Sequence, residues 1–247
     1  MTTFSCYSIK GGVGKTALAV NLAYFLCESG KRTLLIDLDP QGAVGFYFRV
    51  APPRDLPLDK MKELSGRWVR ENLRESDFPG LDILPSCQAH RLLDVALAGM
   101  KKSRKQLKWV IEDLESDYDA VVIDCPPNLT LISENIFRAS QAILVPVIPT
   151  PLSARTLEQL GEFLAAEEIP SGALQPFFSM VQGGKSLHRE LMNSLCAKFP
   201  SFFATGIPFS TDIEKMGIHR KPLLAYSNGH AANKCRELCR EILDRNS

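Results

Sequence analysis

The sequence predicts an α/β fold, a doubly wound and mostly parallel sheet with helices on both faces. Short apolar or β-rich runs recur along the chain, and longer segments with helical spacing lie between many of them. This alternation is typical of parallel strands that are connected by helices. A length of 247 residues suits one large hydrophobic core, so we expect a single domain over residues 1–247.

The expected elements follow these runs in chain order. The first long helix is expected over Thr16–Ser29, because Gly30 suits the position after a helix C-terminus. The second is expected over Ser153–Ile169, where a proline stops it. The proline- and charge-rich region Ala51–Gly80 is expected to be a surface excursion with a short helix around Leu58–Leu73. The expected strands are Phe4–Ile9, Thr33–Asp37, Leu81–Leu84, Ala120–Asp124, Ala142–Ile148 and Gln175–Val181.

The composition is that of an ordinary globular protein and points to no partner. Hydrophobic residues make up 45% of the chain and charged residues 23%, and the formal net charge is +1. Any contact with nucleic acid must therefore come from a local patch. No apolar run approaches the roughly 20 residues of a membrane span. The N-terminus lacks the pattern of a secretory signal, so we expect a cytoplasmic protein without a membrane partner.

The cysteines and histidines are expected to be structural. The seven cysteines are an odd number, form no CxxC pair and lie among apolar neighbours, which indicates buried thiols in a reducing compartment. Cys235 and Cys239 lack zinc-type partners, and Cys125 has no convincing second cysteine for an iron–sulfur cluster. His188 and His219 have no Ser or Cys nucleophile arranged around them.

A glycine-rich loop carries the first chemical signal, the stretch from Ile9 to Thr16 that reads IKGGVGKT. Its glycines allow backbone N–H groups to point at phosphate oxygens, and the helix that follows adds the positive end of its dipole. Lys15 would neutralise the β- and γ-phosphates, and the Thr16 hydroxyl would bind Mg²⁺. The usual pattern, G-x-x-x-x-G-K-[ST], begins with a glycine, whereas this chain has Ile9 at that position. The usual pattern also does not require the lysine that this chain has at position 10. The residues expected to hold the nucleotide are Gly11, Gly12, Val13, Gly14, Lys15, Thr16 and Ala17.

Acidic residues at the ends of two other strands converge on the same site. Asp37 and Asp39 follow one apolar strand, and Asp124 ends another. Because the carboxyl ends of parallel strands open on one edge of the sheet, we expect all three beside the glycine-rich loop. An isolated acid at a strand end is usually a turn or cap residue, but three in this order indicate a site for a nucleoside triphosphate and Mg²⁺.

Together, KGGVGKT, the segment DLDPQG from Asp37 to Gly42 and VVIDCPP from Val121 to Pro127 resemble the ParA/MinD family of deviant Walker A P-loop ATPases, and the ParA branch in particular. The likeness extends over nearly the whole chain, including GLDILPS from Gly80 and VPVIPT from Val145. It implies an ATPase that uses ATP and Mg²⁺ and forms a homodimer.

The resemblance also implies roles for individual residues. Lys10 corresponds to the signature lysine that reaches the nucleotide of the other subunit, where a cation opposite the developing phosphate charge stabilises the transition state. Asp39 is implied to orient the attacking water, and Pro208 to pack near the adenine base. Asp37 and Asp124 are implied to support the Mg²⁺ site together with Thr16.

Two segments depart from the family pattern. Gln182 and Gly184 occupy positions where many ParA proteins carry an aspartate and an arginine, and Phe209 follows Pro208 where an arginine is commoner. Whether these departures weaken dimerisation or DNA binding stays open. The departures suggest an orphan ParA that positions a protein cargo, similar to the McdA-like group that distributes carboxysomes.

The last helix bears on whether the partner surface is DNA or membrane. Its narrow apolar stripe, without an aromatic anchor, indicates a helix packed on its own domain. A DNA-contacting patch and a merely solvated face remain alternatives, because Glu237, Glu241 and Asp244 are interleaved with the basic residues. The basic run Lys101–Lys108 is expected to be an exposed helix face and is a weaker candidate for DNA. The expected DNA-contacting residues are Lys198, Arg220, Lys221, Lys234, Arg236 and Arg240.

The sequence therefore predicts an ATPase that dimerises around ATP and binds nonspecific double-stranded DNA in that state, which would place it on the nucleoid. A ParB-like or cargo-adaptor protein would stimulate hydrolysis, and the cargo would be a plasmid, a chromosome or a protein organelle. Two alternatives stay open. One is a MinD-like membrane-positioning ATPase, and the other is an ATP-dependent metabolic ligase or kinase on the same scaffold.

Overall fold

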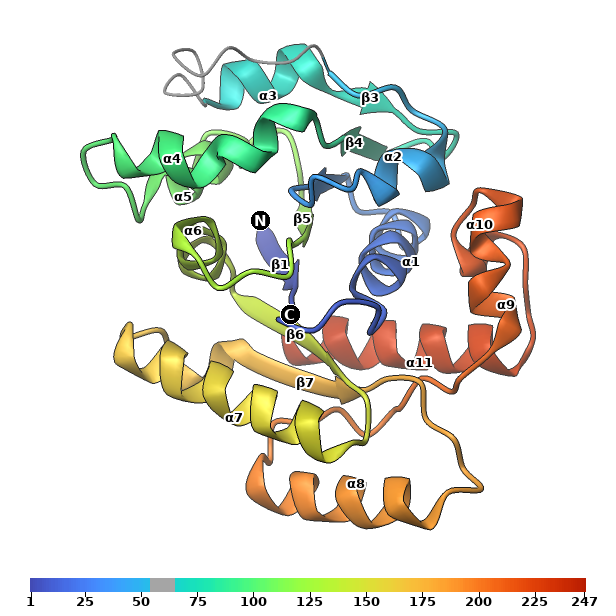
Figure 1. Ribbon diagram of the computed structural model, residues 1–247. Coiled ribbons are helices and arrows are strands. Elements are labelled where there is room, and N and C mark those ends of the chain that lie inside the picture. Colours follow the sequence, from blue (N-terminus) through green and yellow to red (C-terminus); the bar gives the residue numbers. More distant parts are fainter. Residues whose placement is uncertain (54–64) are drawn as a thin grey trace.

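The strands form one sheet at the centre of the molecule. The computed structural model describes residues 1–53 and 65–247. In that part of the chain the sheet has seven strands in the order β3-β4-β2-β5-β1-β6-β7 (Figure 1). All neighbours pair in parallel except β3, which is antiparallel to β4. The strands are β1 (Thr2–Cys6), β2 (Thr33–Asp37), β3 (Arg74–Glu75), β4 (Leu81–Leu84), β5 (Ala120–Asp124), β6 (Ala142–Val147) and β7 (Leu174–Phe178).

Helices cover both faces of this sheet and bury two apolar clusters (Figure 1). The strands β2, β5, β6 and β7 are buried along their whole length, as expected for a parallel sheet with both faces covered. One cluster draws on α1 (Lys15–Glu28), α2 (Ala43–Phe48), α10 (Met216–His219) and α11 (His230–Arg245). The other draws on α3 (Gly66–Asn72), α4 (Leu93–Ala98), α5 (Gln106–Glu112), α6 (Leu131–Ala139), α7 (Pro151–Ala166) and α8 (Ser186–Lys198).

The expected fold class and the two long helices are confirmed, with shifted ends. At the end of α1, Gly30 has a φ of 86° and its N–H donates to the Cys27 carbonyl at 2.9 Å, as the sequence predicts for a glycine after a helix. Helix α7 begins at Pro151, two residues before the expected start. Its cap is Thr150, and proline is well suited to a first helical position.

Several strand and loop expectations need correction. Strand β1 ends at Cys6 rather than at Ile9, and β7 ends at Phe178, because Met180 adopts a left-handed φ of 53°. Of the helix expected around Leu58–Leu73, residues 58–64 lie outside the described residues, and α3 occupies Gly66–Asn72. The short elements β3, α2 and α4 were not foreseen.

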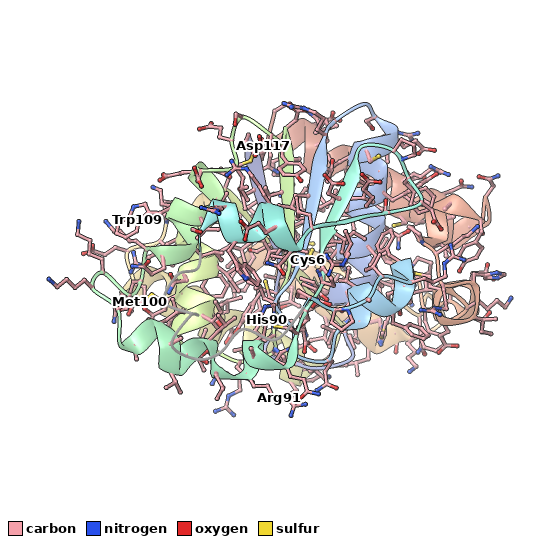
Figure 2. The ribbon with its side chains drawn as sticks, turned by 90° about the horizontal axis from the view of Figure 1, so that it is seen from above. Cys6, His90, Arg91, Met100, Trp109 and Asp117 are labelled. Atoms are coloured by element: carbon pink, nitrogen blue, oxygen red, sulfur yellow. The ribbon has the colours of Figure 1, made fainter. Side chains whose placement is uncertain are left out.

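The basic run is only partly helical. Helix α5 begins at Gln106, so Lys101–Lys105 form the turn that precedes it. Their side chains are nevertheless largely exposed, and Figure 2 places Met100 and Trp109, which flank this turn, at the periphery of the molecule.

Not all the thiols are buried. All seven cysteines are free, but Cys27 is only partly buried and Cys196 is exposed. The remaining five are buried, and Cys6 lies at the centre of the sheet on β1 (Figure 2).

The last helix, α11, packs on its own domain as predicted. Its apolar side chains, including Leu238, Cys239 and Ile242, are fully buried in the cluster beneath α1. Among the described residues, no helix is both long enough and apolar enough to cross a membrane.

Candidate functional site

The glycine-rich loop joins β1 to α1 at the carboxyl edge of the sheet. Gly12 and Gly14 have φ values of 69° and 100°, a region that glycine enters without the cost borne by other residues. Gly14 is the N-cap of α1, and no side chain caps this end, so N–H groups of the first turn stay available to an anion. The side chain of Lys15 is only 7% exposed, and its Nζ donates to the Lys10 carbonyl at 3.4 Å. The loop is therefore built as a phosphate cradle.

Lys10, the other lysine of the loop, is held only through its backbone among the described residues. The Lys10 backbone N–H donates to the Ser8 hydroxyl at 3.3 Å, whereas the Lys10 ammonium has no ion pair or hydrogen bond among the described residues. Gly11 and Gly12 beside it are exposed. Lys10 thus offers a positive charge that residues 1–53 and 65–247 leave unpaired.

The acidic strand ends lie next to this loop, as predicted. The Thr16 hydroxyl donates to Oδ2 of Asp124 at 2.6 Å. Asp37 is the register partner of Asp124 across β2 and β5, and both carboxyl groups are fully buried. Burial is the main cause that raises the pKa of Asp124 to about 7, and the negative charge of Asp39 adds to it.

The strand of Asp37 also fixes the turn that carries Asp39. Asp37 accepts hydrogen bonds from the backbone N–H groups of Asp39 at 3.0 Å and Val44 at 3.1 Å. Burial, followed by repulsion from Asp124, raises the pKa of Asp37. Asp39 is partly exposed, and one of its carboxylate oxygens accepts from the Gln41 N–H at 2.9 Å. Asp37 therefore holds the backbone of the turn, while the Asp39 carboxylate is partly exposed to solvent.

These side chains fit a magnesium ion that is shared with phosphate. Oδ1 of Asp124 is buried without a hydrogen-bond partner, which is costly unless a ligand satisfies it. Among the described residues, no group of three His, Cys, Asp or Glu side chains is arranged to hold a metal. A cation at Thr16, Asp37 and Asp124 would thus need phosphate and water oxygens to complete its shell, as Mg²⁺ does at nucleotide sites.

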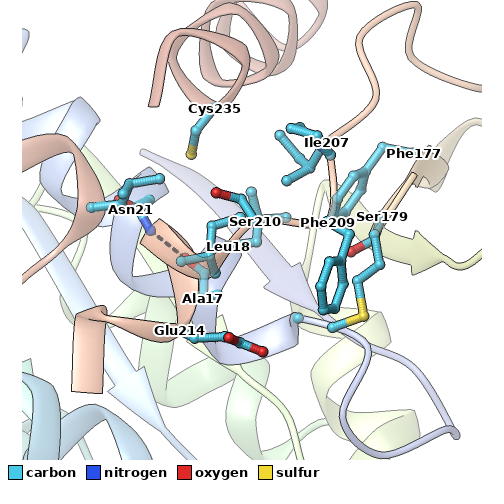
Figure 3. A pocket seen from close by; sticks show the side chains of 15 residues that line it. Ala17, Leu18, Asn21, Phe177, Ser179, Ile207, Phe209, Ser210, Glu214 and Cys235 are labelled. Carbon is cyan, nitrogen blue, oxygen red and sulfur yellow. Dashed lines mark hydrogen bonds between the residues drawn. The ribbon is translucent and has the colours of Figure 1, made fainter. Parts of the chain in front are cut away.

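An apolar pocket opens beside the first turns of α1 (Figure 3). It has an empty volume of about 590 Å³. Gly14 and Ala17 line it on the side of the phosphate loop, and Pro208 lines it on the opposite side. The structure therefore brings Pro208 and Ala17, which lie far apart in the sequence, to one cavity that is continuous with the loop.

Hydrogen bonds hold the two walls of the pocket together. The Ser179 hydroxyl donates to the Val13 carbonyl at 2.8 Å, which ties the end of β7 to the loop. Val181 pairs with Pro208 in an isolated parallel bridge, so the Pro208 segment follows the sheet edge. Sequence reasoning missed Ser179 and Asn21. The i, i+4 spacing of Ala17 and Asn21 on α1 is a signal that would have found Asn21.

Comparison with known proteins decides the family. Residues 1–168 match the family described as AAA domain. The cell division protein PomZ of Myxococcus xanthus is 30% identical over 253 residues, which cover 96% of this chain and 76% of PomZ. Chromosome partitioning proteins of Caulobacter vibrioides and Treponema pallidum also match nearly the whole chain, at 28% and 29% identity. The chain belongs to the ParA family of P-loop ATPases.

Solved structures share the fold of this ParA-family ATPase. A variant of McdA from Cyanothece in complex with ATP has a TM-score of 0.85 at 21% identity, over 99% of this chain and 96% of that one. Cobyrinic acid a,c-diamide synthase from Mycobacterium smegmatis, with bound ADP and magnesium, has a TM-score of 0.78 at 25% identity, over 98% and 94% of the two chains. The same scaffold therefore occurs in McdA and in a diamide synthase.

The segment that departs from the ParA pattern packs against α8. The backbone N–H of Gln182 donates to Nδ1 of His188 at 3.2 Å, and His188 is one of the two side chains that α8 buries. Gly183 and Gly184 are exposed, with open space around their Cα atoms. In this ParA-family ATPase the loop is thus held by an uncharged contact.

The helices that carry the basic residues expected to contact DNA belong to two different apolar clusters. Helix α8, which ends at Lys198, packs on one face of the sheet, whereas α10 and α11 pack on the other (Figure 1). Lys198 also pairs with Glu158 at 2.7 Å. The contact of Lys198 with DNA stays a prediction, and this ion pair makes Lys198 a weaker candidate than the unpaired basic residues.

The other five basic residues differ in how far they are already engaged. Arg236 is committed to the fold, since it bonds Glu28 at 3.0 Å and the Leu224 carbonyl at 2.8 Å. Lys234 pairs with Glu237 at 2.6 Å, and the Arg220 guanidinium lies 4.8 Å from the centre of the Phe46 ring. Lys221 and Arg240 are exposed and have no ion pair among the described residues.

Proposed function

We propose that the chain is a nucleotide-driven switch that dimerises around two ATP molecules, binds nonspecific double-stranded DNA in that state and positions a cargo. In this proposal hydrolysis is stimulated by a ParB-like or cargo-adaptor protein and returns the chain to monomers. ATP supplies binding energy that only the dimer can use, and its loss shifts the population back. The protein would then reside on the nucleoid in the cytoplasm.

The observation that carries the proposal is the free ammonium group of Lys10 beside a complete phosphate cradle. Lys15 is the buried lysine of the loop, and it suffices for the phosphates bound by its own subunit. An ammonium group with no partner among the described residues of its own chain is available to the nucleotide of a second copy. There it would act on developing phosphate charge as an arginine finger does.

Exposed apolar side chains around the site support a second copy as the partner. Leu129 follows β5, Leu152 begins α7 after β6, and Val95 lies on α4 beyond β4, so all three follow carboxyl ends of parallel strands. Leu152 is 62% exposed and Val95 61%. Figure 2 places Arg91, just before α4, at the end of the molecule opposite Asp117, which precedes β5. An apolar rim on the nucleotide edge favours burial against another protein surface.

The remaining site residues divide the chemistry among them. Gly11, Gly12, Val13 and Gly14 would hold the phosphates, with Lys15 as their counter-charge. Thr16, Asp37 and Asp124 would hold Mg²⁺, which supplies charge neutralisation at the β- and γ-phosphates when it is bound. The Asp39 carboxylate, anchored through its turn to Asp37, would orient the attacking water. Ala17 and Pro208 would enclose the adenine base.

The deciding experiment measures DNA binding with ATP, with ADP and without nucleotide, for the wild type and for Lys10→Ala. Binding of nonspecific DNA by the wild type with ATP alone, and its loss in Lys10→Ala, is expected. Salt should weaken the binding steeply, because phosphate contacts release counterions. DNA binding that is indifferent to nucleotide and to Lys10 would refute the switch.

The biosynthetic alternative rests on the likeness to cobyrinic acid a,c-diamide synthase. It predicts ATP consumption that depends on a small carboxylic acid and not on DNA or a partner protein. The membrane alternative predicts ATP-dependent binding to liposomes. It is disfavoured because the apolar stripe of α11 is buried in the fold. The same ATP, ADP and no-nucleotide series, with liposomes or with small acids in place of DNA, separates the three functions.

A further inference from the structure

The polar side chains that line the pocket beside α1 are almost all engaged within the protein. Asn21 is 2% exposed, and its amide donates to the Ala17 carbonyl at 2.7 Å and accepts from the Leu224 N–H at 3.1 Å. The Ser179 hydroxyl donates to the Val13 carbonyl at 2.8 Å. The Cys235 thiol is hydrogen-bonded to Cys239. These groups have little capacity left for a ligand.

Glu214 is the exception in this pocket. Its side chain is exposed, lines the pocket and has no hydrogen bond or ion pair among the described residues. Figure 3 shows its carboxylate beside Ala17, across the pocket from Phe209. The Ser210 hydroxyl, the other polar group on this wall, already accepts from the Asp212 N–H at 3.2 Å. Glu214 thus supplies the one carboxylate, and a side chain without any hydrogen-bond partner among the described residues, in the lining of this mostly apolar cavity.

The short helix that carries Glu214 is held in place. It is α9 (Thr211–Glu214), which Ser210 caps. The Tyr226 hydroxyl donates to the Asp212 carbonyl at 2.6 Å, and the Lys215 N–H donates to the Thr211 carbonyl at 2.9 Å. The backbone position of Glu214 is therefore fixed relative to α1, and only its side-chain rotamer needs to adjust to a ligand.

We propose that Glu214 determines base specificity by accepting a hydrogen bond from the exocyclic amine of adenine, an inference that rests on the proposed nucleotide function. A carboxylate only accepts hydrogen bonds. Adenine presents an amine donor at C6, whereas guanine and hypoxanthine present a carbonyl oxygen there, so a carboxylate facing that edge favours adenine and repels the other two. A site built around one hydrogen bond rejects analogues that cannot make it.

The test measures the affinity of wild-type protein and Glu214→Ala for ATP and for purine riboside triphosphate, which lacks any group at C6. We expect the wild type to prefer ATP. Glu214→Ala should lose about five- to tenfold in ATP affinity, the range expected for a solvent-accessible hydrogen bond to a charged group. Its affinity for purine riboside triphosphate should not change. Thr211→Ala, an exposed change on the same helix, is the matched control and should bind both nucleotides like the wild type.

A second variant, Glu214→Gln, adds a hydrogen-bond donor at the position where the wild type has only acceptors. Glu214→Gln can turn its amide N–H towards a carbonyl oxygen, so it should narrow the preference for ATP over GTP. The inference is overturned if Glu214→Ala keeps the preference for ATP over purine riboside triphosphate. It is also overturned if the variant instead loses discrimination against 2′-deoxy-ATP, since Glu214 would then contact the sugar.

The failure of this inference is distinguishable from that of the proposed function. If the wild type binds no nucleoside triphosphate, the proposed function fails. If the wild type binds ATP and the Glu214 variants bind it equally well, only the base-specificity inference fails. Unfolding temperatures without nucleotide should be alike for all variants, because Glu214 has no partner in the described fold whose loss would destabilise it.

Discussion

The Thr16 hydroxyl donates a hydrogen bond of 2.6 Å to the buried carboxylate of Asp124, so the phosphate loop and β5 are already joined at the expected magnesium site. Thr16→Val should lower ATP affinity in the presence of Mg²⁺ by about 10- to 100-fold, the usual cost of losing a group that orients a metal ligand. Thr16→Ser should retain most of the affinity. Isothermal titration with Mg²⁺ and with EDTA checks this, and an equal loss in EDTA would contradict a role at the metal.

Burial of Asp124 also predicts how the stability of the nucleotide-free protein depends on pH. The pKa of Asp124 is raised to about 7 in the fold, mainly by burial, from an ordinary value near 4. A carboxyl group raised in this way stabilises the fold fully below its unfolded value and loses that contribution as the pH rises through about 7. The free energy of unfolding should therefore fall as the pH rises from about 4 to about 7 and level off above that.

Asp124→Asn is the control that isolates this carboxyl group from other groups that titrate in the same range. Urea unfolding of the variant should show a weaker dependence on pH between about 4 and 7. Identical slopes for the two proteins would mean that Asp124 is not the group responsible.

The strand ends illustrate what the sequence can predict. Asp37 and Asp124 each end an apolar run, and a parallel sheet brings the carboxyl ends of its strands to one edge. The sequence could therefore predict that these two residues lie close together, as they do. Lys198 shows the limit. Its ion pair with Glu158 depends on how α8 packs against α7, and the sequence pattern carries no information on that packing.

The position of the pocket wall could not be predicted from the sequence either. Its position depends on the left-handed turn at Met180 and on the bridge between Val181 and Pro208, which are tertiary features. The likeness to ParA proteins placed Pro208 near the base, but no local pattern singled out Glu214.

Asn21 should be important for stability as well as for the shape of the pocket. Its amide satisfies the buried N–H of Leu224, and Asn21→Ala would leave that donor without a partner. We expect a loss of about 1–3 kcal/mol in the free energy of unfolding, the usual cost of an unsatisfied buried polar group. Asn233→Ala removes an exposed amide on α11 and should change it by less than about 0.5 kcal/mol. Urea denaturation of both variants tests the contrast.

The apolar rim should control dimerisation without affecting the fold. Leu152 is the second residue of α7 and Leu187 the second residue of α8, and both are at least half exposed. A glutamate is favourable at either helix N-terminus. Leu152→Glu should weaken the ATP-dependent dimer, while Leu187→Glu, away from the nucleotide edge, should not. Sedimentation velocity with a slowly hydrolysed ATP analogue measures both, and equal dimerisation of the two variants would place the interface elsewhere.

Arg240 is the best-placed residue of the proposed DNA surface, because it is exposed on α11 and has no ion pair among the described residues. A lysine or arginine that contacts one phosphate contributes about one unit to the slope of log affinity against log salt. Arg240→Ala should thus weaken binding to all DNA sequences alike and reduce that slope by about 1, when the titration is made with ATP.

Lys198→Ala is the matched change at a lysine that is already paired with Glu158 on α7, so it should leave both the affinity and the slope unchanged. Arg236→Ala should behave differently from both. The Arg236 guanidinium bonds Glu28 and the Leu224 carbonyl, so it contributes to the fold. This variant should lose stability and leave the salt slope of the folded protein as it is. A reduced slope for Lys198→Ala with an unchanged slope for Arg240→Ala would move the DNA surface to the α8 face.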